Sequence, residues 1–416
     1  MSKRVRFTFE DWGWVVISLG MGTGAGIAMV PVEAGLRGFW IFILASVICY
    51  PSMYLFQRVF VNSLMGKRSA DDYIDNVTGY LGTRAGRIIG AAYFLMLVIW
   101  FLVYSETVVR DAASYLYTFV GTPSGLGENP LFIIGTIGVL TQIALTGEKV
   151  LFRLSSVLAI SVLVVIFALG LVMIPHWNHD NIEVLPGIFG IIEDVLITLP
   201  FVLTSILFLQ SLSPMVFSFR KSSESLEVAW FRSQRAMTIA YLILFFLVFF
   251  YAVSFNLSIT QSEAQQAHSE NVTALAIVAR GAGSRVWLTV LSVLLDVMAV
   301  LTCFLVVTLA LRASSHHLIR GAMIRMGMKA PSERTVGRVT LATVVLLATV
   351  NAYANIPLIW FFLVSSPIFG IVGCFVPVYM IRKIDELQRF RGFQLWLVTF
   401  TGILLCLAPL VALIRA

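Results

Sequence analysis

The sequence predicts an all-α polytopic membrane protein with about eleven transmembrane helices. Hydrophobic residues make up 59% of the 416 residues and charged residues only 12%, and the mean hydropathy is +0.91. A soluble domain would be nearer half apolar. Apolar runs of about 20 residues, long enough to cross a bilayer as helices, recur along the whole chain. The alternation typical of a membrane β-barrel is absent and the loops are too short for a soluble domain, so we expect one transmembrane domain over residues 1–416.

The apolar runs define the expected helices in chain order. Each run is bounded by polar or charged residues, and we assign one membrane span to each. The last run, 393–414, is expected to be an extra helix added to ten others. The expected spans are 11–36, 38–61, 86–118, 130–146, 150–174, 190–218, 235–258, 285–311, 337–353, 356–380 and 393–414.

The basic residues predict the orientation of the chain in the membrane. With the N-terminus placed in the cytoplasm, all but five of the 29 Lys and Arg residues fall in cytoplasmic segments. Cytoplasmic loops carry such an excess, so we expect a cytoplasmic N-terminus and a periplasmic or extracellular C-terminus. This explains the net charge of +7 without a nucleic-acid partner. Residues 1–10 are polar and the run after them is too long for a signal peptide, so none is expected. The five exceptions are Arg37, Arg110, Arg280, Arg285 and Arg415.

The first span contains a stretch that disfavours a continuous helix. Between Gly20 and Pro31, glycines occupy alternate positions ahead of a proline. Glycine inside a helix costs about 1 kcal/mol relative to alanine, and Pro31 cannot donate to the carbonyl of Ile27. We therefore expect the helix to break here. Non-helical backbone at membrane depth is tolerated only where protein buries it or where it lines a watery cavity, so the stretch is a candidate binding site.

The sixth span carries a second anomaly. A polar cluster runs from Thr204 to Pro214 at mid-depth, and Pro214 removes the hydrogen bond to the carbonyl of Gln210. If the chain holds two five-helix repeats, 11–174 and 190–380, an interrupted span opens each repeat, which is the best sequence indication of a transporter site. Two plainer explanations stay open. Glycine and proline are common in membrane helices, and glycines four apart also form small-xxx-small packing pairs.

Ionisable residues inside the spans are candidates for ion coupling. Asp296, in the eighth span, is the carboxylate expected near the midplane, and Thr302 follows it. Glu106 lies four residues before Arg110 in the third span, so these two can neutralise each other. Intramembrane ionisable residues normally face the bundle interior or a water-filled cavity. Asp296 is therefore a candidate proton carrier, ion ligand or amine partner, and Glu106 is the second candidate. The alternative is a structural role, in which Asp296 pairs with Arg110 or accepts hydrogen bonds from hydroxyl groups.

The sequence gives no indication of catalysis, a resident metal or a cofactor. The four cysteines fall inside expected spans without metal-ligand spacing, and we expect them to be small packing residues. His176, His179, Asp180 and Glu183 have the composition of a metal site, but a solvated loop is the plainer explanation. No HExxH motif or nucleophile elbow occurs, so an enzyme is not expected.

Three of these stretches resemble a known family. Gly24–Pro31 (GAGIAMVP) resembles the GAGxxxxP turn that opens the hydroxy and aromatic amino acid permeases, a branch of the amino acid/polyamine/organocation superfamily that includes serine/threonine transporters. Ser213-Pro214 resembles the serine-proline pair of that family's sixth helix, and Tyr104-Ser105 has a similar counterpart in the third. The motifs cover a few dozen residues, whereas the layout of about eleven helices matches over the whole chain.

The resemblance implies the leucine-transporter fold, with five plus five inverted helices and the substrate between broken helices 1 and 6. On this analogy, amides at a helix N-terminus hold the substrate carboxylate, and the sixth helix meets its amine and side chain. Thr302 and Cys303 stand where related folds place the serines and threonines of a sodium site. The implied substrate-binding residues are Thr23, Gly24, Ala25, Gly26, Ile27, Tyr104, Ser205, Gln210 and Ser211.

We therefore expect a secondary active transporter of the inner membrane that imports an amino acid by alternating access. Proton coupling through Asp296 or Glu106 is preferred, and sodium coupling through Thr302 and carbonyls of the first helix is the alternative. A non-transporting nutrient receptor or a channel also stays open. The expected partners are a small amino acid, a co-transported proton or sodium ion and the lipid bilayer. Gln210-Ser211-Leu212 departs from the family's phenylalanine, asparagine and histidine, so the sequence does not identify the amino acid.

Overall fold

In the part of the chain that the computed structural model describes, all regular secondary structure is helical. That part comprises residues 5–23, 25–67, 70, 72–123, 125–146, 148–182, 187–270, 290, 293–294, 297–300, 303–304, 307–308, 310–312, 314–315, 319, 323 and 332–415. A π-helical turn, Gly370–Phe375, joins α15 to α16. The α-helices are α1 (Phe9–Gly22), α2 (Ala25–Arg37), α3 (Phe39–Ser63), α4 (Tyr73–Leu81), α5 (Thr83–Val120), α6 (Pro130–Thr146), α7 (Glu148–Met173), α8 (Ile188–Thr204), α9 (Leu209–Ser222), α10 (Leu226–Ser258), α11 (Gln261–Ser269), α14 (Glu333–Ala354), α15 (Leu358–Phe369), α16 (Val376–Lys383) and α17 (Gln394–Arg415).

These helices follow the spans predicted from the sequence. Every predicted span outside 285–311 contains a helix at nearly the same place, and the described residues between 290 and 312 are helical. By length and composition, 6 helices are able to cross a membrane, or 7 if the bent pair α8–α9 counts as one span, when only the described residues are searched. The other expected spans are interrupted, shorter or partly outside those residues. The total of about eleven therefore stays a prediction.

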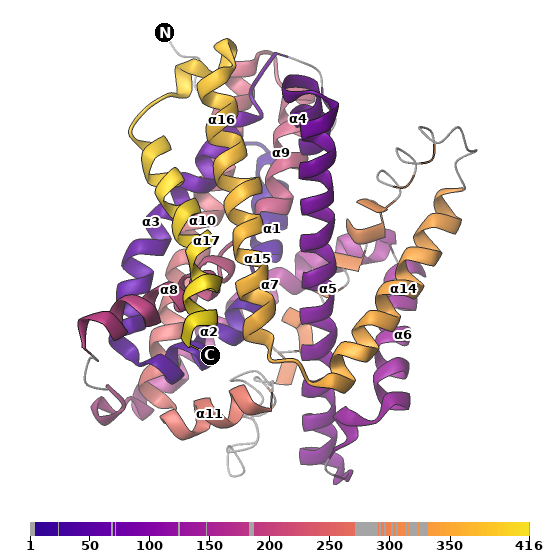
Figure 1. Ribbon diagram of the computed structural model, residues 1–416, viewed down its shortest axis with the longest axis vertical. Helices are drawn as coiled ribbons and strands as arrows, with labels where there is room; N and C mark the ends of the chain where they lie inside the picture. Colours follow the sequence, from indigo (N-terminus) through magenta and orange to yellow (C-terminus); the bar gives the residue numbers. More distant parts are fainter. Residues whose placement is uncertain are drawn as a thin grey trace.

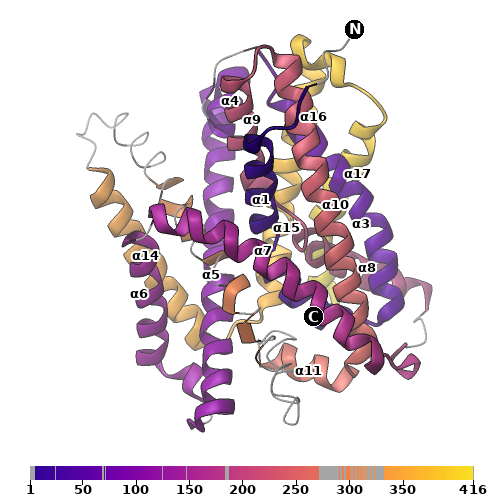
Figure 2. The same ribbon diagram turned by 180° about the vertical axis from the view of Figure 1, so that it is seen from behind.

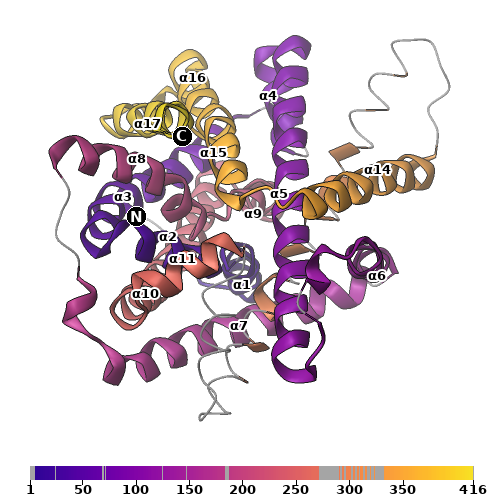
Figure 3. The ribbon, with the colours of Figure 1, turned by 60° about the horizontal axis from the view of Figure 1, so that its bottom comes forward.

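The helices form a main bundle and a smaller lateral group. In the bundle, α3, α10 and α17 pack around the two broken spans, α1–α2 and α8–α9 (Figure 1). α7 crosses the back of the bundle diagonally, against α1 and α10 (Figure 2). α6 and α14 pack against each other and against the long helix α5, away from the bundle (Figure 3). α5 therefore belongs to both parts and carries contacts between them.

The first broken span is confirmed, and its location can be given. α1 starts with a capping box, in which Thr8 and Asp11 satisfy each other's backbone amides, and it ends at Gly22. α2 begins at Ala25 and continues through Pro31 to Arg37. The proline is therefore accommodated inside a helix, and the chain breaks at the glycine-rich residues before it.

The second broken span is also confirmed, but its predicted cause, Pro214, is wrong. α8 ends at Thr204, α9 begins at Leu209, and the two axes meet at 42°. α9 runs through Pro214 to Ser222. The break thus precedes Gln210, because hydroxyl groups at the end of α8 bond back to their own helix and close it before the proline is reached.

The two ends of the chain lie toward opposite ends of the bundle. The N-terminal end is beside α16, and α17 runs from that end down toward α2 (Figure 1). The Lys and Arg pattern predicts termini on opposite sides of the membrane. Which end faces the cytoplasm stays a prediction.

Candidate functional site

At the first break, hydrogen bonds from Thr23 cap the last turn of α1. The Thr23 amide donates to the carbonyl of Leu19 at 3.1 Å, and the Thr23 hydroxyl donates to the carbonyl of Gly20 at 3.0 Å. α2 then starts at Ala25. The first amides of a helix have no carbonyl partner within it and form the positive end of its dipole. The start of α2 therefore presents hydrogen-bond donors at the break.

The second break presents acceptors instead. The Thr204 hydroxyl donates to the carbonyl of Phe201 at 3.0 Å, and the Ser205 hydroxyl donates to that of Val202 at 2.6 Å. For the next carbonyls, those of Leu203 and Thr204, we find no donor in the described part of the chain. The last carbonyls of a helix form the negative end of its dipole. The end of α8 is thus suited to a cationic group.

A small cavity lies between the two breaks. Its volume is about 40 Å³. This is room for about three water molecules, because one water needs about 10–15 Å³ by the same measure. The end of α1, the middle of α5, the second break, the helical segment around 303–310 and the end of α15 surround it. The described residues that line it are Gly20, Met21, Leu97, Trp100, Tyr104, Thr204, Leu207, Gln210, Cys303, Val307, Ala310 and Phe369.

One wall of this cavity is aromatic. The Trp100 ring lies 5.6 Å from that of Tyr104 and 6.2 Å from that of Phe369, centroid to centroid. Trp100 is only 6% exposed, and its indole N–H has no acceptor among the described residues. A buried donor without a partner costs about 1–3 kcal/mol, so this N–H is available to a ligand. Trp100 is not among the residues predicted from the sequence, although its spacing of four from Tyr104 places both side chains on one helix face.

Two of the predicted binding residues line the cavity directly. These are Tyr104, from α5, and Gln210, from the first turn of α9. Thr23 is buried beside the first break and caps α1. Gly24 lies outside the described residues, and the residues 25–27 contribute described backbone at the start of α2. The first break therefore offers its backbone, while the second adds a polar side chain.

The two predicted serines are buried beside the cavity and hydrogen-bonded to protein. Ser205 bonds to its own helix, and its neighbour Thr204 lines the cavity. The Ser211 hydroxyl donates to the carbonyl of Phe208 at 2.8 Å and lies 2.9 Å from the Ser18 hydroxyl. The Ser18–Ser211 contact joins α1 to α9, so Ser211 links the two broken spans.

Glu106 is held in a buried polar cluster between α5 and α14. Arg110 Nε lies 2.9 Å from Glu106 Oε1, which confirms the predicted pairing of these residues. Asn351 Nδ2 donates to the other carboxylate oxygen at 3.1 Å, and Arg110 also donates to the carbonyl of Ala352 at 2.7 Å. Glu106 does not line the small cavity. The other predicted coupling residues, Asp296 and Thr302, lie outside the described residues.

An ionic cluster lies at the far end of α2. Arg37 Nη1 lies 3.0 Å from Asp194 Oδ1 of α8, and Arg37 Nε lies 3.7 Å from Glu33 Oε2. His268 Nδ1 of α11 lies 3.3 Å from the other oxygen of Glu33. The hydrogen bond to Glu33 raises the pKa of His268, against the effect of partial burial. This outer cluster ties α2 to α8 and α11.

A second ionic cluster lies at the start of α1. Arg232 of α10 lies 2.8 Å from Glu10 Oε2 and 3.1 Å from Asp11 Oδ1, and Arg235 lies 3.3 Å from Asp11 Oδ2. Ser218 of α9 donates to Glu10 at 2.9 Å. This inner cluster joins α1, α9 and α10. Each broken span is therefore tied to its neighbours by ion pairs at the end away from the cavity.

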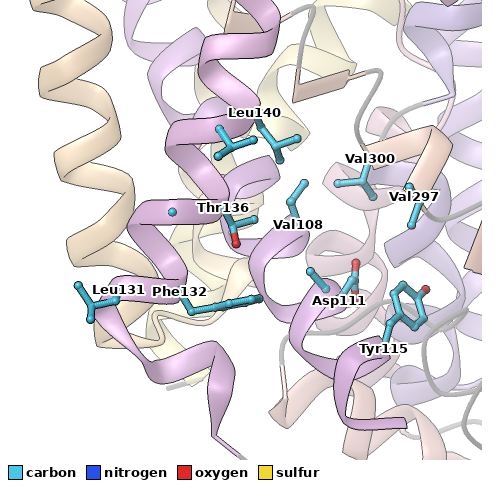
Figure 4. Close-up of a pocket in the computed structure, with 12 residues that line it drawn as sticks. Val108, Asp111, Tyr115, Leu131, Phe132, Thr136, Leu140, Val297 and Val300 are labelled. Carbon is cyan, nitrogen blue, oxygen red and sulfur yellow. The ribbon is translucent and has the colours of Figure 1, made fainter. Parts of the chain in front are cut away.

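A larger cavity beyond α5 is a weaker candidate for a polar ligand. It has a volume of about 550 Å³ and lies between α5, α6 and the segment 297–300 (Figure 4). Its lining is mostly apolar and includes Leu131 and Val139, whose exposed fractions are 81% and 60%. Such side chains at membrane depth face hydrocarbon. Asp111 is the charged residue among those that line it, so the cavity lacks a complementary pair of charges.

Comparison with known proteins identifies relatives over nearly the whole chain. No family model matches the sequence. It is 43% identical over 414 residues to the serine transporter of Escherichia coli O157:H7, covering 99% of this chain and 93% of that protein. It is 23% identical over 391 residues to the serine transporter SdaC of Escherichia coli K12, covering 92% of this chain and 90% of that protein. It is 21% identical over 402 residues to the inner membrane transport protein YqeG of that strain, covering 95% and 96%.

Solved structures with the leucine-transporter fold are also similar. MhsT in complex with L-phenylalanine matches with a TM-score of 0.62 at 13% identity, covering 97% of each chain. A variant of the manganese transporter of Eremococcus coleocola matches with a TM-score of 0.60 at 14% identity, covering 97% of this chain and 85% of that one. At these identities the likeness shows the fold alone. The 43% identity over almost the full length of both proteins shows more: the chain belongs to the serine transporter family of the hydroxy and aromatic amino acid permeases, a family of multi-pass membrane transporters and not of enzymes.

Proposed function

We propose that this protein imports L-serine, or a closely related small hydroxyl amino acid, across the inner membrane by alternating access. The observation that carries the proposal is the small cavity lined by the last turn of α1, beside the first break, and by Thr204, Leu207 and Gln210 of the second break. The names of the relatives support serine as substrate and the inner membrane as location.

The two breaks suit the two charges of a zwitterion. The substrate carboxylate would accept hydrogen bonds from the first amides of α2, at the positive end of its dipole. The ammonium group would donate to the open carbonyls of Leu203 and Thr204 at the end of α8. Gln210, Tyr104 and the Trp100 N–H would then surround the side-chain hydroxyl. Recognition would thus divide between backbone for the charges and side chains for the hydroxyl.

The size of the cavity supports an alternating-access cycle. The cavity has room for about three waters, whereas serine has more non-hydrogen atoms than that, so substrate binding requires the helices to separate. The ion pairs of the inner cluster hold the start of α1 closed against α10, and those of the outer cluster hold the end of α2. Opening toward either side would break one cluster while the other persists.

The proposed architecture assigns these elements to two inverted repeats. Residues 11–174 would form the first repeat, 190–380 the second, and 393–414 the extra helix. α1–α2 and α8–α9 then occupy corresponding positions, as expected for the paired interrupted spans of a transporter. The Lys and Arg distribution supports a cytoplasmic position for the inner cluster.

Proton coupling is the preferred source of energy in this proposal. Asp296 would carry the proton, with Glu106 as second candidate, because protonating Glu106 would release Arg110 from its ion pair. Sodium coupling through Thr302 and carbonyls of the first break is the alternative.

Uptake by the purified protein in proteoliposomes tests the proposal. A panel of radiolabelled amino acids is offered with an inward proton gradient, an inward sodium gradient or neither. We expect serine to accumulate above all others in the panel, and under the proton gradient. Accumulation under sodium alone would contradict the coupling, and the absence of amino acid uptake under both gradients would contradict the proposed function.

A further inference from the structure

A large polar cavity lies at the end of the molecule that holds the N-terminus. It has a volume of about 1170 Å³. The N-terminal segment, the end of α3, the start of α10 and the segment between α16 and α17 enclose it. It is separate from the cavity between the two breaks, with which it shares no described lining residue.

The lining of this cavity carries an excess of positive charge. Arg232 is already paired with carboxylates of the inner cluster. The other arginines make no ion pair with a carboxylate in the described part of the chain. Arg391 donates to the carbonyl of Arg382, and Arg389 lies over the ring of Phe390. The charged residues that line the cavity are Arg6, Arg58, Arg232, Arg389 and Arg391, against Glu224 and Glu227.

Exposed aromatic side chains on the elements that line the cavity are here called its aromatic rim. Phe393 and Trp396 at the start of α17 are 75% and 64% exposed, and Phe231 of α10 is 45% exposed. Phe7 and Phe9 of the N-terminal segment are 40% and 90% exposed. Aromatic rings gather where a membrane protein meets the boundary between hydrocarbon and water. These exposed rings favour a position of the cavity at headgroup level.

We propose that this cavity binds the phosphodiester headgroup of an anionic phospholipid such as phosphatidylglycerol. Arginine is suited to phosphate because its planar guanidinium donates paired hydrogen bonds to two oxygens. Basic pockets between helices at the membrane surface are a recognised type of headgroup site. Here the arginines Arg58, Arg389 and Arg391 hold the phosphate, and the aromatic rim contacts the start of the acyl chains. A soluble phosphate ester shares the headgroup chemistry but would gain nothing from the aromatic rim.

The position of the cavity connects the lipid to the transport machinery. Thr8 and Arg232 line it and also belong to the inner cluster around Glu10 and Asp11. A bound phosphate beside Arg232 adds negative charge next to this cluster and joins the N-terminal segment to α10. Lipid binding therefore stabilises the closed arrangement of the start of α1.

Lipid binding to the full-length protein, measured by native mass spectrometry, tests the inference. The detergent-solubilised protein is titrated with phosphatidylglycerol, with the zwitterionic phosphatidylethanolamine and with glycerol phosphate. The test variant combines Arg58→Gln and Arg389→Gln. The control combines Arg84→Gln and Arg87→Gln, which remove the same charge from the start of α5 and do not line the cavity.

The expected result is preferential binding of phosphatidylglycerol to the wild type. The test variant should lose about thirty-fold in affinity, because each basic residue near an anionic lipid contributes a factor of about five. The control variant should bind as the wild type does. Equal losses in both variants, or no preference over phosphatidylethanolamine, would overturn the proposal. Binding of glycerol phosphate as tight as that of the lipid would show a soluble phosphate site instead.

The melting temperature gives a second readout that does not need transport activity. Phosphatidylglycerol should raise it for the wild type and for the control variant, but not for the test variant. A test variant that still melts cooperatively in detergent is folded, so its loss of lipid binding then reports on the cavity itself. An equal rise in all three proteins would contradict the site.

Discussion

The two interrupted spans of this protein break in different ways. In the first, the chain turns after Gly22, and the Thr23 hydroxyl closes α1 on the carbonyl of Gly20. In the second, the hydroxyls of Thr204 and Ser205 close α8, and the chain passes through Phe208 before α9 begins. One break presents the amides of a helix start, and the other the carbonyls of a helix end.

Because the two breaks differ in this way, one cavity can recognise opposite charges without charged side chains. Acidic or basic residues at this depth would be costly to bury, whereas helix ends supply partial charges of both signs. No Asp, Glu, Lys or Arg is among the described residues that line the small cavity. Variants that fill this cavity should have larger effects than variants that change its side chains, and variants of contacts outside the cavity should have the smallest effects.

Filling the cavity from the first break should have the largest effect. Gly20 lines the cavity, and Gly20→Leu places four additional carbons where about three waters fit. We expect serine uptake to fall about 100-fold, since overpacking costs up to about 3 kcal/mol. The matched control is Gly13→Leu on the same helix, where an added Cβ meets nothing within 4 Å. If both leucines act alike, the loss does not arise from the cavity.

Removing the polar side chain of the second break should have the next largest effect. Gln210→Leu keeps the size of the side chain but removes its hydrogen bonds. The KM for serine should rise about tenfold, because one lost hydrogen bond costs about 1.5 kcal/mol. The comparison variant is Gln261→Leu at the exposed start of α11. An unchanged KM in the Gln210 variant would exclude contact between this side chain and the substrate.

The aromatic wall offers a finer test of side-chain recognition. Trp100→Phe keeps a ring but removes the unpartnered indole N–H. The KM for serine should rise about fivefold, as for the loss of a hydrogen bond of about 1 kcal/mol, while that for alanine should change less. Trp396→Phe, at a ring 64% exposed, is the control. Equal changes for serine and alanine would mean that the N–H does not contact the hydroxyl.

The contact between the two broken spans should affect stability more than substrate affinity. Ser18→Ala and Ser211→Ala each remove one side of the same hydrogen bond. Each should lower the free energy of unfolding by about 1 kcal/mol, and the double variant should lose less than the sum. Thermal melting in detergent measures this cycle. Additive losses would mean that the two hydroxyls do not interact, and a raised KM for serine only in the Ser211 variant would place Ser211 in the binding site.

The smallest expected effect concerns pH at the outer end of α2. Glu33 raises the pKa of His268, so protonation of the histidine favours the folded contact. Its contribution is fully present below the unfolded pKa of about 6.5 and is lost as the pH rises through the folded value. Arg37 faces the same carboxylate and opposes protonation. The melting temperature of the wild type should exceed that of His268→Gln by more at about pH 5.5 than at about pH 8.5. A difference in melting temperature that is independent of pH would contradict a stabilising contact between protonated His268 and Glu33.

The sequence predicted both breaks because their causes are local. Glycine at alternate positions is unfavourable to a helix whatever surrounds it, and a run of hydroxyl residues is unusual at membrane depth. The spacing of Glu106 and Arg110 also predicted their ion pair. The exact course of the second break was not predictable from Pro214, because a proline can be accommodated within a helix when the preceding turn has already broken.

Contacts between distant segments could not be predicted in the same way. The partners of the Glu106 cluster on α14, Asn351 and Ala352, lie far along the chain, and no local pattern indicates them. Ser211 meets Ser18 only because α9 packs against α1. Trp100 becomes a candidate ligand contact only when its N–H is seen to be buried without an acceptor. These features depend on tertiary packing, which the periodicity of single helices does not contain.

Competition between serine and its analogues tests whether the protein recognises both charges of its substrate. Uptake of radiolabelled serine into proteoliposomes is measured against excess ethanolamine, which lacks the carboxylate, against 3-hydroxypropionate, which lacks the amine, and against unlabelled serine. If each break recognises one charge, unlabelled serine alone should inhibit, because loss of either charge removes a charge-assisted set of hydrogen bonds. Inhibition by ethanolamine or 3-hydroxypropionate as strong as that by serine would contradict recognition of a zwitterion between the two breaks.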